Sequence, residues 1–243
     1  GIKAWAPHVI YNHGMTDVEI ESELVRKWPT YLYVHSSYGT CISGTKRWIR
    51  PQLTICERVL GPACLGFYLP LGCGGKNPFT CWKAYKRARQ RQALLSSYRG
   101  IMVASNWMLK DYQRHGAMKD RLHLVPLFPP GVQAHSSPPL ARPFSNRLLF
   151  AGRVVENKGW RHALAAVEKA SALLGRNLQL VVAGDGPDMP RLKDEAEKAG
   201  LNNQCLGWIN PQELQLEMCR SDLLLMPSLW AEPFSLLGIE AGC

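Results

Sequence analysis

Two short stretches in the second half of the chain have the residue types of a phosphate-binding site. The first, Gly152-Arg153-Val-Val-Glu-Asn-Lys158-Gly159, places two cations between an apolar run and an expected helix start. A guanidinium and an ammonium beside helix N–H groups would bind a phosphate or a diphosphate. The second, Gly184-Asp-Gly-Pro187, has two glycines that would let the backbone approach a ligand, although a simple tight turn explains this stretch better when it is taken alone.

A pair of glutamates lies near the end of the chain. Glu232 falls in the loop before the last expected helix, and Glu240 falls about two turns into that helix, close to the same face. A loop carboxylate could face a sugar ring, and a helix carboxylate could accept hydrogen bonds from the hydroxyls of a diol. For an isolated pair, an acid attracted by the helix dipole and a solvated surface acid are the better explanation.

Alternating strands and helices would position these stretches. Apolar runs predict strands at 147–152, 178–183 and 222–227, and helices are expected at 158–174, at 188–199, after Asn210 and from about Phe234 to the last residue. This order implies a parallel sheet, and continuous apolar strands fit a sheet covered on both faces. Ligands of such sheets bind beyond the carboxyl ends of the strands. We therefore expect 152–153, 184–186 and 227–232 to meet at one edge.

The first half predicts the same class of fold. Strands are expected at 8–12 and 30–34, ending at His13 and His35, and at 101–105 and 122–126, with a helix at 106–114 between the last two. A basic amphipathic helix is expected at 81–98. Its apolar side is expected to carry Trp82, Tyr85, Leu95 and Tyr98.

Composition divides the chain at its proline-rich middle. Residues 126–147 hold six of the 17 prolines, and the net charge of +10 belongs to the first half, where residues 1–125 have 18 Lys and Arg against 7 Asp and Glu. We interpret 126–146 as a linker between a domain at 1–125 and a domain at 147–243. A long surface loop within one domain is the alternative. No apolar run approaches about 18 residues, so no transmembrane helix is predicted.

The order of these motifs resembles a known family. The set comprises Gly152-Arg153 with Lys158-Gly159, then Gly184-Asp-Gly-Pro187, Gly207-Trp208, Pro227-Ser228, and Glu232 with Glu240-Ala241. From about Arg147 onward it closely resembles the nucleotide-sugar-binding domain of family 4 retaining glycosyltransferases, which have the glycosyltransferase B architecture. The first half looks like the acceptor domain of this family, with His35 after a strand and Ala104–Met108 before a helix.

The resemblance implies an α/β fold and a function. The fold would have two Rossmann-like domains whose parallel sheets face a cleft that holds the sugar nucleotide. The enzyme would move a sugar from a nucleotide-diphosphate donor to a hydroxyl of a glycan or lipid-linked acceptor, with retention of configuration. It would need no cofactor and no catalytic metal, and it would be cytoplasmic. A sugar-nucleotide epimerase of the same architecture and a non-catalytic basic module that binds membrane or nucleic acid are the alternatives.

The resemblance also implies roles for single residues. Arg153 and Lys158 would bind the donor diphosphate, and Glu240 would hold the ribose hydroxyls. Glu232 would contact the transferred sugar, and His35 would lie at the boundary between donor and acceptor, so these two are the expected catalytic residues. The remaining expected donor-binding residues are Gly152, Gly184, Gly186, Trp208, Pro233, Phe234, Ser235 and Leu236.

The sequence departs from the family pattern in three places. Ser235 stands where many relatives have glycine, the family's first strand and its glycine-rich loop have no counterpart, and relatives continue beyond Cys243. We therefore expect the chain to be an internal part of a longer enzyme, with both domains incomplete. By itself it is expected to have little or no activity, because half of the diphosphate site would be missing.

Five of the eight cysteines lie within 41 residues, inside a basic segment that we interpret as an insertion at about 41–99. Their spacing is not that of a zinc finger or ribbon, yet Gly61-Pro-Ala-Cys64 and Gly72-Cys-Gly-Gly75 place thiols in turns, where metal ligands often lie. The stretch resembles a cysteine-bearing insertion of some bacterial family members. Two hypotheses stay open: isolated free thiols, or a structural zinc site of Cys41, Cys56, Cys64 and Cys73.

The cations of residues 76–99 allow three interpretations. A solvated helix face is the commonest, followed by peripheral contact with an anionic membrane surface that presents a lipid-linked acceptor, here the inner face of the membrane. Nucleic-acid binding ranks last because no recognition motif supports it. The cations are Lys76, Lys83, Lys86, Arg87, Arg89, Arg91 and Arg99.

Overall fold

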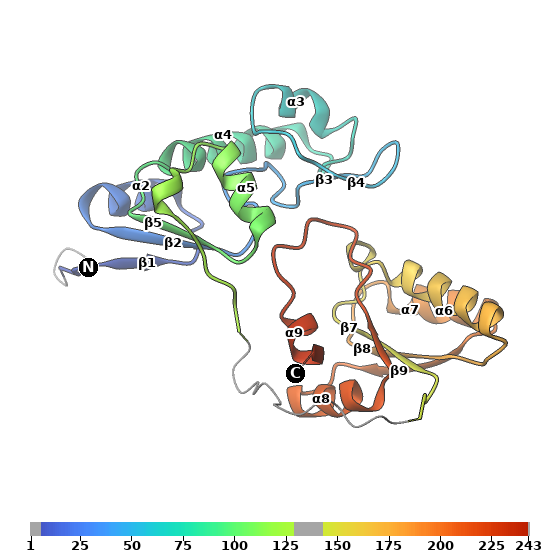
Figure 1. Ribbon diagram of the computed structural model, residues 1–243. Helices are drawn as coiled ribbons and strands as arrows, with labels where there is room; N and C mark the ends of the chain where they lie inside the picture. Colours follow the sequence, from blue (N-terminus) through green and yellow to red (C-terminus); the bar gives the residue numbers. More distant parts are fainter. Residues whose placement is uncertain (1–5, 129–142, 243) are drawn as a thin grey trace. The chain divides into compact units, whose positions relative to one another are not determined.

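A computed structural model describes residues 6–128 and 143–242 of the chain (Figure 1). The chain divides into two compact units. The first comprises Gly1–Leu127 and Trp230–Phe234, and the second comprises Phe128–Leu229 and Ser235–Cys243. Most of the predicted linker at 126–146 lies outside the described residues. The expected α/β class with parallel sheets is confirmed for both units.

The second unit is built on a four-stranded sheet in the order β10-β7-β8-β9, with every neighbouring pair parallel. Its strands are β7 (Arg147–Ala151), β8 (Gln179–Ala183), β9 (Asn202–Gly207) and β10 (Leu223–Leu225). Leu148 pairs with Leu180 on one side and with Leu223 on the other. β7 therefore lies inside the sheet, which explains its unbroken apolar sequence.

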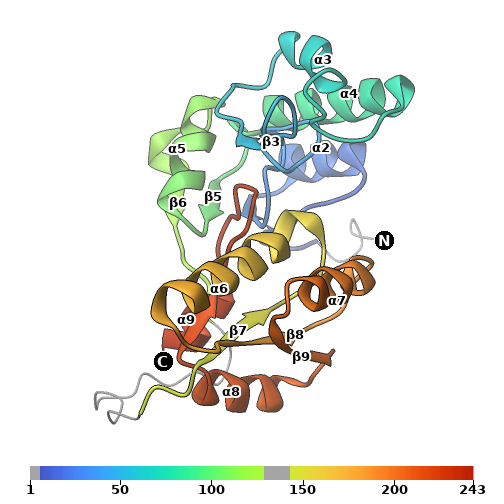
Figure 2. The same ribbon diagram turned by 90° about the vertical axis from the view of Figure 1, so that its right-hand side faces the viewer.

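Helices cover both faces of this sheet. Alternate residues of the strands contact opposite layers: Leu148 and Phe150 pack in one hydrophobic cluster, and Leu149 packs in the other. The first cluster is completed by α6 (Trp160–Leu174) and α7 (Met189–Lys198), and the second by α8 (Pro211–Arg220). Figures 1 and 2 show α6 and α7 on one side of the sheet and α8 on the other.

Local signals fix the helix ends in the second unit. Gly175 follows α6 in the left-handed region, with φ at 60°, where an L side chain is strained. Asn210 caps α8 in a capping box: its side chain accepts a hydrogen bond from the Glu213 N–H, and the Glu213 side chain accepts one from the Asn210 N–H. The predicted helix starts and ends are confirmed here to within a few residues.

The first unit has a four-stranded parallel sheet in the order β1-β2-β5-β6. The strands are β1 (Ile10–Asn12), β2 (Thr30–Val34), β5 (Gly100–Val103) and β6 (Leu122–Leu124). α2 (Val18–Lys27) connects β1 to β2, and α5 (Asn106–Arg114) connects β5 to β6. The core contains Leu32, Val34, Ile101, Val103, Met108 and Tyr112.

The chain between β2 and β5 adds a short hairpin and two helices. These are β3 (Arg47–Trp48), β4 (Thr54–Ile55), α3 (Ala63–Tyr68) and α4 (Pro78–Leu94). The predicted apolar side of the helix is wrong at Trp82, which is 50% exposed, because α4 buries the face of Cys81 and Ala88 instead. Leu95 and Tyr98 are buried, but they lie beyond the helix end.

A buried carboxylate ties α2 to the basic helix. Glu21 accepts hydrogen bonds from the Tyr38 and Tyr98 hydroxyls, and the Arg91 Nε lies 3.3 Å from its Oε2. Burial and the Glu21 hydrogen bond raise the pKa of both tyrosines. The network stabilises the first unit around the end of β1. Within the described residues, no helix is both long and apolar enough to span a bilayer.

Candidate functional site

The strand order of the second unit creates a topological switch point. After β7 the chain adds β8 and then β9 toward one edge of the sheet. It then returns past β7 and adds β10 at the opposite edge. The strand order therefore reverses between β7 and β10, and in open α/β sheets ligands bind in the crevice outside the strand ends at such a point. Two of the predicted stretches, 152–159 and 227–232, follow these two strands.

The loop after β10 lies directly against the loop after β7. A methyl group added at Gly159 would lie 1.9 Å from the carbonyl oxygen of Pro227, so only glycine permits this contact. The Leu229 N–H donates a hydrogen bond of 2.8 Å to the Asn157 carbonyl. The φ angle of Gly159 is 74°, in the left-handed region, which is a second and independent reason for glycine at this position. The first and third stretches are thus brought together.

The loop after β8 also packs against the loop after β7. An added methyl group at Gly184 would lie 2.0 Å from the Gly152 carbonyl oxygen, and one at Gly186 would lie 2.3 Å from the Val154 carbonyl oxygen. The Val154 N–H donates to the Asp185 carbonyl at 3.0 Å. Both glycines therefore permit close approach of a neighbouring loop. Approach of a ligand, the reason predicted from sequence, stays a prediction.

Side chains hold the start of α6 in place beneath these loops. The Trp160 Nε1–H donates a hydrogen bond of 3.2 Å to Asp188, just after the β8 loop. Arg161 pairs with both carboxylate oxygens of Glu195 at 2.9–3.1 Å and so connects α6 to α7. Trp160 is fully buried. The helix start that follows Lys158 is therefore a fixed element.

The two predicted cations lie in the loop between β7 and α6. Arg153 directly follows the end of β7 and is exposed, and it makes no ion pair with any residue that the structure describes. Lys158 is half-buried and ends the short 3-10 turn Glu156–Lys158 before α6. Both belong to the same loop as Gly159, so the structure places both cations at the carboxyl edge of β7.

Glu240 and Ser235 belong to the same unit as these cations. Glu240 is half-buried in α9 (Leu236–Gly242), the last helix, which starts two residues later than the sequence predicted. Ser235 precedes α9, and its hydroxyl lies 3.4 Å from the Met226 sulfur, at the end of β10. Leu236 is exposed. The loop after β9 contains Trp208, which is 79% exposed, and Gly207 accepts a hydrogen bond from the Gly184 N–H.

Glu232 belongs to the first unit, within Trp230–Phe234. Its N–H donates to the Trp230 carbonyl at 2.7 Å, in a tight turn. Pro233 is buried, and Phe234 packs against the core cluster of the first unit. The structure therefore groups the two glutamates with different units. A common site for them stays a prediction.

His35 has a partner that the sequence analysis did not use. The Nε2 of His35 lies 2.9 Å from the Nδ1 of His13, and their rings stack with centroids 5.2 Å apart. Burial and then the neighbouring His13 lower the pKa of His35. The two histidines follow β1 and β2, which are adjacent parallel strands. In the sequence, the signal for this contact was that both histidines follow expected strands. The side chains meet because these two strands, β1 and β2, are neighbours in the sheet.

Comparison with known proteins shows that part of this chain matches a family. Residues 135–243 match the family described as glycosyl transferases group 1. A 2-deoxystreptamine glucosyltransferase of Streptomyces kanamyceticus is 40% identical over 86 residues, which is 34% of this chain and 22% of that protein. The match thus spans less than a quarter of this relative's length.

Solved structures resemble the chain in fold. The pneumococcal O-GlcNAc transferase GtfA, in complex with UDP and GlcNAc, has a TM-score of 0.64 at 12% identity, covering 99% of this chain and 41% of that protein. Anabaena HepE, in complex with UDP and glucose, has a TM-score of 0.57 at 13% identity, covering 99% and 58%. These neighbours have the glycosyltransferase B fold with two Rossmann-like domains, which confirms the expected architecture.

Proposed function

We propose that this chain, whose residues 135–243 belong to the glycosyl transferases group 1 family, binds a nucleotide-diphosphate sugar at the carboxyl edge of β7 and β10. The sugar is transferred to a hydroxyl of a glycan or lipid-linked acceptor with retention of configuration, as in family 4. The observation that carries the proposal is the packing of Gly159 against Pro227, which joins two loops at the switch point of the sheet.

The cations of the β7 loop supply the electrostatic part of the reaction. As the bond between sugar and diphosphate breaks, negative charge grows on the leaving nucleoside diphosphate. Fixed positive groups that meet this charge stabilise the transition state more than the ground state. Arg153 forms a fork of donors suited to phosphate oxygens, and Lys158 acts as a second point charge.

Two carboxylates are assigned to the sugars of the donor. Glu240 accepts hydrogen bonds from the ribose hydroxyls, which a half-buried carboxylate on a helix of the same unit can do. Glu232 contacts the transferred sugar near its reacting carbon, and His35 acts at the boundary with the acceptor. The roles of Glu232 and His35 rest on the family resemblance. The UDP complexes of GtfA and HepE support a nucleoside diphosphate as the ligand class.

A thermal-shift panel of nucleoside diphosphates tests this proposal. A ligand that binds only the native state at about 100 times its Kd stabilises it by about 2.7 kcal/mol, which raises the melting temperature by several degrees. We expect UDP or another nucleoside diphosphate to raise it, and inorganic phosphate at equal concentration to have a smaller effect. A flat response to uridine, guanosine and adenosine diphosphates would contradict the proposal.

The panel also separates the alternatives. A sugar-nucleotide epimerase would bind the same ligands but would convert the donor without an acceptor, which product analysis detects. A non-catalytic basic module would show salt-sensitive binding of polyanions and no response to nucleoside diphosphates. The tight packing of loops at the switch point favours the transferase over the module, because polyanion binding needs no such junction of loops.

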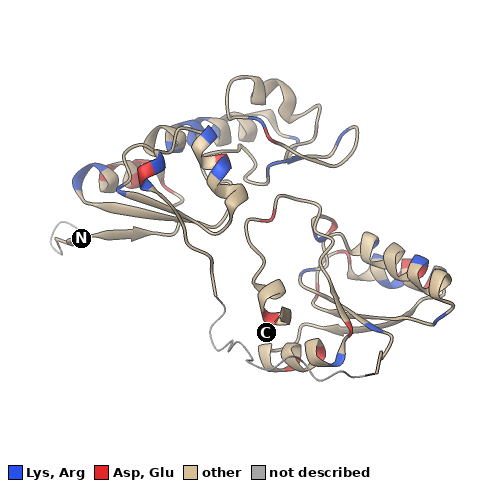
Figure 3. Ribbon diagram, in the orientation of Figure 1, with Lys and Arg blue, Asp and Glu red and all other residues tan. Residues whose placement is uncertain are grey.

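The helix α4 supports a peripheral contact with an anionic membrane surface. Phe79 and Trp82 are 78% and 50% exposed, and the Lys86 ammonium lies 5.8 Å from the centre of the Trp82 ring. Lys83, the residue after Trp82, is also exposed. Figure 3 shows Lys and Arg along α4. Exposed aromatic rings beside cations are the side chains that anchor a helix at a lipid interface.

Liposome flotation measures this contact. We expect the chain to float with vesicles that contain anionic lipid and not with neutral vesicles. Each cation near the surface contributes about 1 kcal/mol, so replacing Lys83 and Lys86 by alanine weakens binding roughly 30-fold. The control is Lys169→Ala with Lys193→Ala, two exposed lysines of the second unit. Equal recovery with both kinds of vesicle rules the contact out.

A further inference from the structure

The segment from Cys41 to Asn77 is folded with almost no hydrophobic core. It contains the two-residue strands β3 and β4 and the short helix α3, and its buried hydrophobic side chains are Leu60 and Tyr68. Independent units below about 40 residues usually need disulfides or metal ions, because they bury little apolar surface. A crosslink would therefore stabilise this segment.

Polar contacts attach one side of this segment to α5. The Lys46 ammonium, 1% exposed, lies 2.9 Å from Asp111, and it also donates to the Arg58 carbonyl at 2.8 Å. The Leu60 N–H donates to the His115 Nε2 at 2.9 Å. These contacts fix where the segment lies on α5. The hairpin itself is joined to the end of α3 by two backbone hydrogen bonds, from the Ile49 and Arg50 N–H groups to the Leu71 carbonyl at 2.8 and 3.1 Å.

Four cysteines from separate parts of this segment line one small cavity at its centre. Cys41 follows β2, Cys56 follows β4, Cys64 lies in α3, and Cys73 follows α3. The cavity is about 30 Å³ in volume, and all four residues line it together with Arg58 and Tyr68. Cys81, the fifth cysteine of this region, does not line the cavity. The four residues that converge are the four that the sequence suggested.

The backbone already holds these cysteines in place. The N–H groups of Cys56, Cys64 and Cys73 donate to the carbonyls of Lys46, Gly61 and Tyr68 at 2.7–3.0 Å. All four thiols are free. No three metal-ligating side chains of the described residues are already arranged around one point, so the thiols must rotate about χ1 to share an ion.

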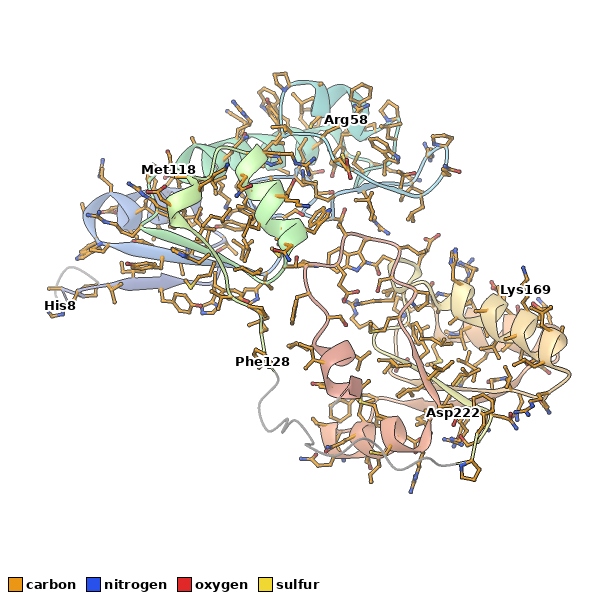
Figure 4. All side chains as sticks on the ribbon, viewed as in Figure 1. His8, Arg58, Met118, Phe128, Lys169 and Asp222 are labelled. Carbon is orange, nitrogen blue, oxygen red and sulfur yellow. The ribbon has the colours of Figure 1, made fainter. Side chains whose placement is uncertain are left out.

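The charges around the cavity suit four thiolates with a divalent ion. Zinc held by four cysteine thiolates carries two excess negative charges. Arg47, Arg58 and Lys46 line the same cavity, and the Arg58 guanidinium is held over the Phe67 ring at 3.8 Å. Figure 4 labels Arg58 among the loops that join β4 and α3. Cations around a thiolate cluster offset its charge and lower the cost of burying it.

We propose that Cys41, Cys56, Cys64 and Cys73 bind one structural Zn²⁺ that fastens the β3–β4 hairpin to α3. Zinc prefers tetrahedral coordination by four thiolates at about 2.3 Å. Each thiol loses its proton on binding, so four protons are released for each ion bound. The ion takes no part in sugar transfer. This site lies within the first unit and does not rest on the proposed function.

Metal analysis of the purified chain tests the proposal. Protein from zinc-supplemented cells is expected to carry about one zinc per chain by inductively coupled plasma mass spectrometry. Titration of the wild-type chain with p-hydroxymercuribenzoate should release this zinc to a colorimetric indicator. Replacement by Co²⁺ should give the intense visible bands and the sulfur-to-metal charge-transfer band of tetrahedral cobalt thiolate. These measurements use the wild-type chain and so do not depend on the folding of a variant.

Cysteine variants identify the ligands. Cys64→Ser is expected to lose most of the zinc, whereas Cys219→Ser, at an exposed position of α8, keeps it. Circular dichroism reports on the folding of both variants without reference to nucleotide binding. Absence of zinc and of cobalt bands, two disulfides among the four cysteines, or full zinc content in Cys64→Ser would each overturn the proposal.

Discussion

Gly159→Ala is expected to destabilise the second unit by about 3–5 kcal/mol and to abolish nucleoside diphosphate binding. The new methyl group would lie 1.9 Å from the Pro227 carbonyl oxygen and 2.8 Å from its carbonyl carbon. Both partners are backbone, so no side chain can turn aside. Either the loop after β10 or the start of α6 must move, and the two loops then no longer meet at the switch point.

The other end of the same helix provides the matched control. Gly175 follows α6 with φ at 60°, similar to the 74° of Gly159, but an added methyl group there has no neighbour within 4 Å. Gly175→Ala therefore has only the cost of a left-handed alanine, about 1–2 kcal/mol. Nucleotide binding should persist in this variant, because the position lies at the far end of α6 from the loops.

Urea denaturation of both variants measures the difference. The free energy of unfolding of the second unit should fall more in Gly159→Ala than in Gly175→Ala by at least about 2 kcal/mol, the cost of the clash beyond that of the backbone conformation. Titration calorimetry then measures nucleoside diphosphate binding below the melting temperature. Equal losses of stability in the two variants would show that the contact with Pro227 does not constrain the loops.

The fold of the second unit could be predicted from sequence because its signals are local. Continuous apolar runs indicate β7 and β8, and Gly175 and Asn210 indicate where helices end and begin. β9 was not predicted. Its sequence, Asn202–Gly207, begins with three polar residues, and because it is an edge strand that pairs with β8 alone, it does not need to be apolar on both faces.

Long-range polar contacts left no signal in the sequence. Glu21 pairs with Tyr38, Tyr98 and Arg91, which lie between 17 and 77 residues away along the chain. The spacing of these residues has no helix or strand period, so sequence patterns cannot bring them together. The same holds for His13 and His35, whose contact depends on the pairing of β1 with β2.

The meeting of the predicted stretches at one edge of the sheet followed from one rule about parallel sheets. The carboxyl ends of strands share an edge, so residues after different strands can be placed together without knowledge of side chains. This reasoning located Arg153, Lys158 and Gly184. It gave no account of the glycines as loop contacts, since a clash with Pro227 or Gly152 depends on coordinates. It also did not predict that Glu232 belongs to the first unit.

Arg153→Ala is expected to weaken nucleoside diphosphate binding about 10- to 150-fold while leaving the stability of the free protein unchanged. Hydrogen bonds to charged groups contribute about 1.5–3 kcal/mol, which corresponds to this range. Arg153 is exposed and forms no ion pair with the described residues, so its removal leaves no buried partner unsatisfied. Arg153→Lys should recover part of the affinity, because the charge remains and the planar fork of donors is lost.

The control for this prediction removes the same charge elsewhere. Lys169 is exposed on α6, nine residues beyond the helix start, and it is labelled in Figure 4. If Arg153→Ala weakened binding only by lowering the overall positive charge, Lys169→Ala would weaken it equally. Salt at about 0.15 M would then restore most of the lost affinity in both variants, because it screens charges that are far from the ligand. Direct contact predicts that Lys169→Ala binds like the wild type. An Arg153→Ala variant whose Kd stays within about twofold of the wild type, at unchanged stability, would place the diphosphate away from the β7 loop.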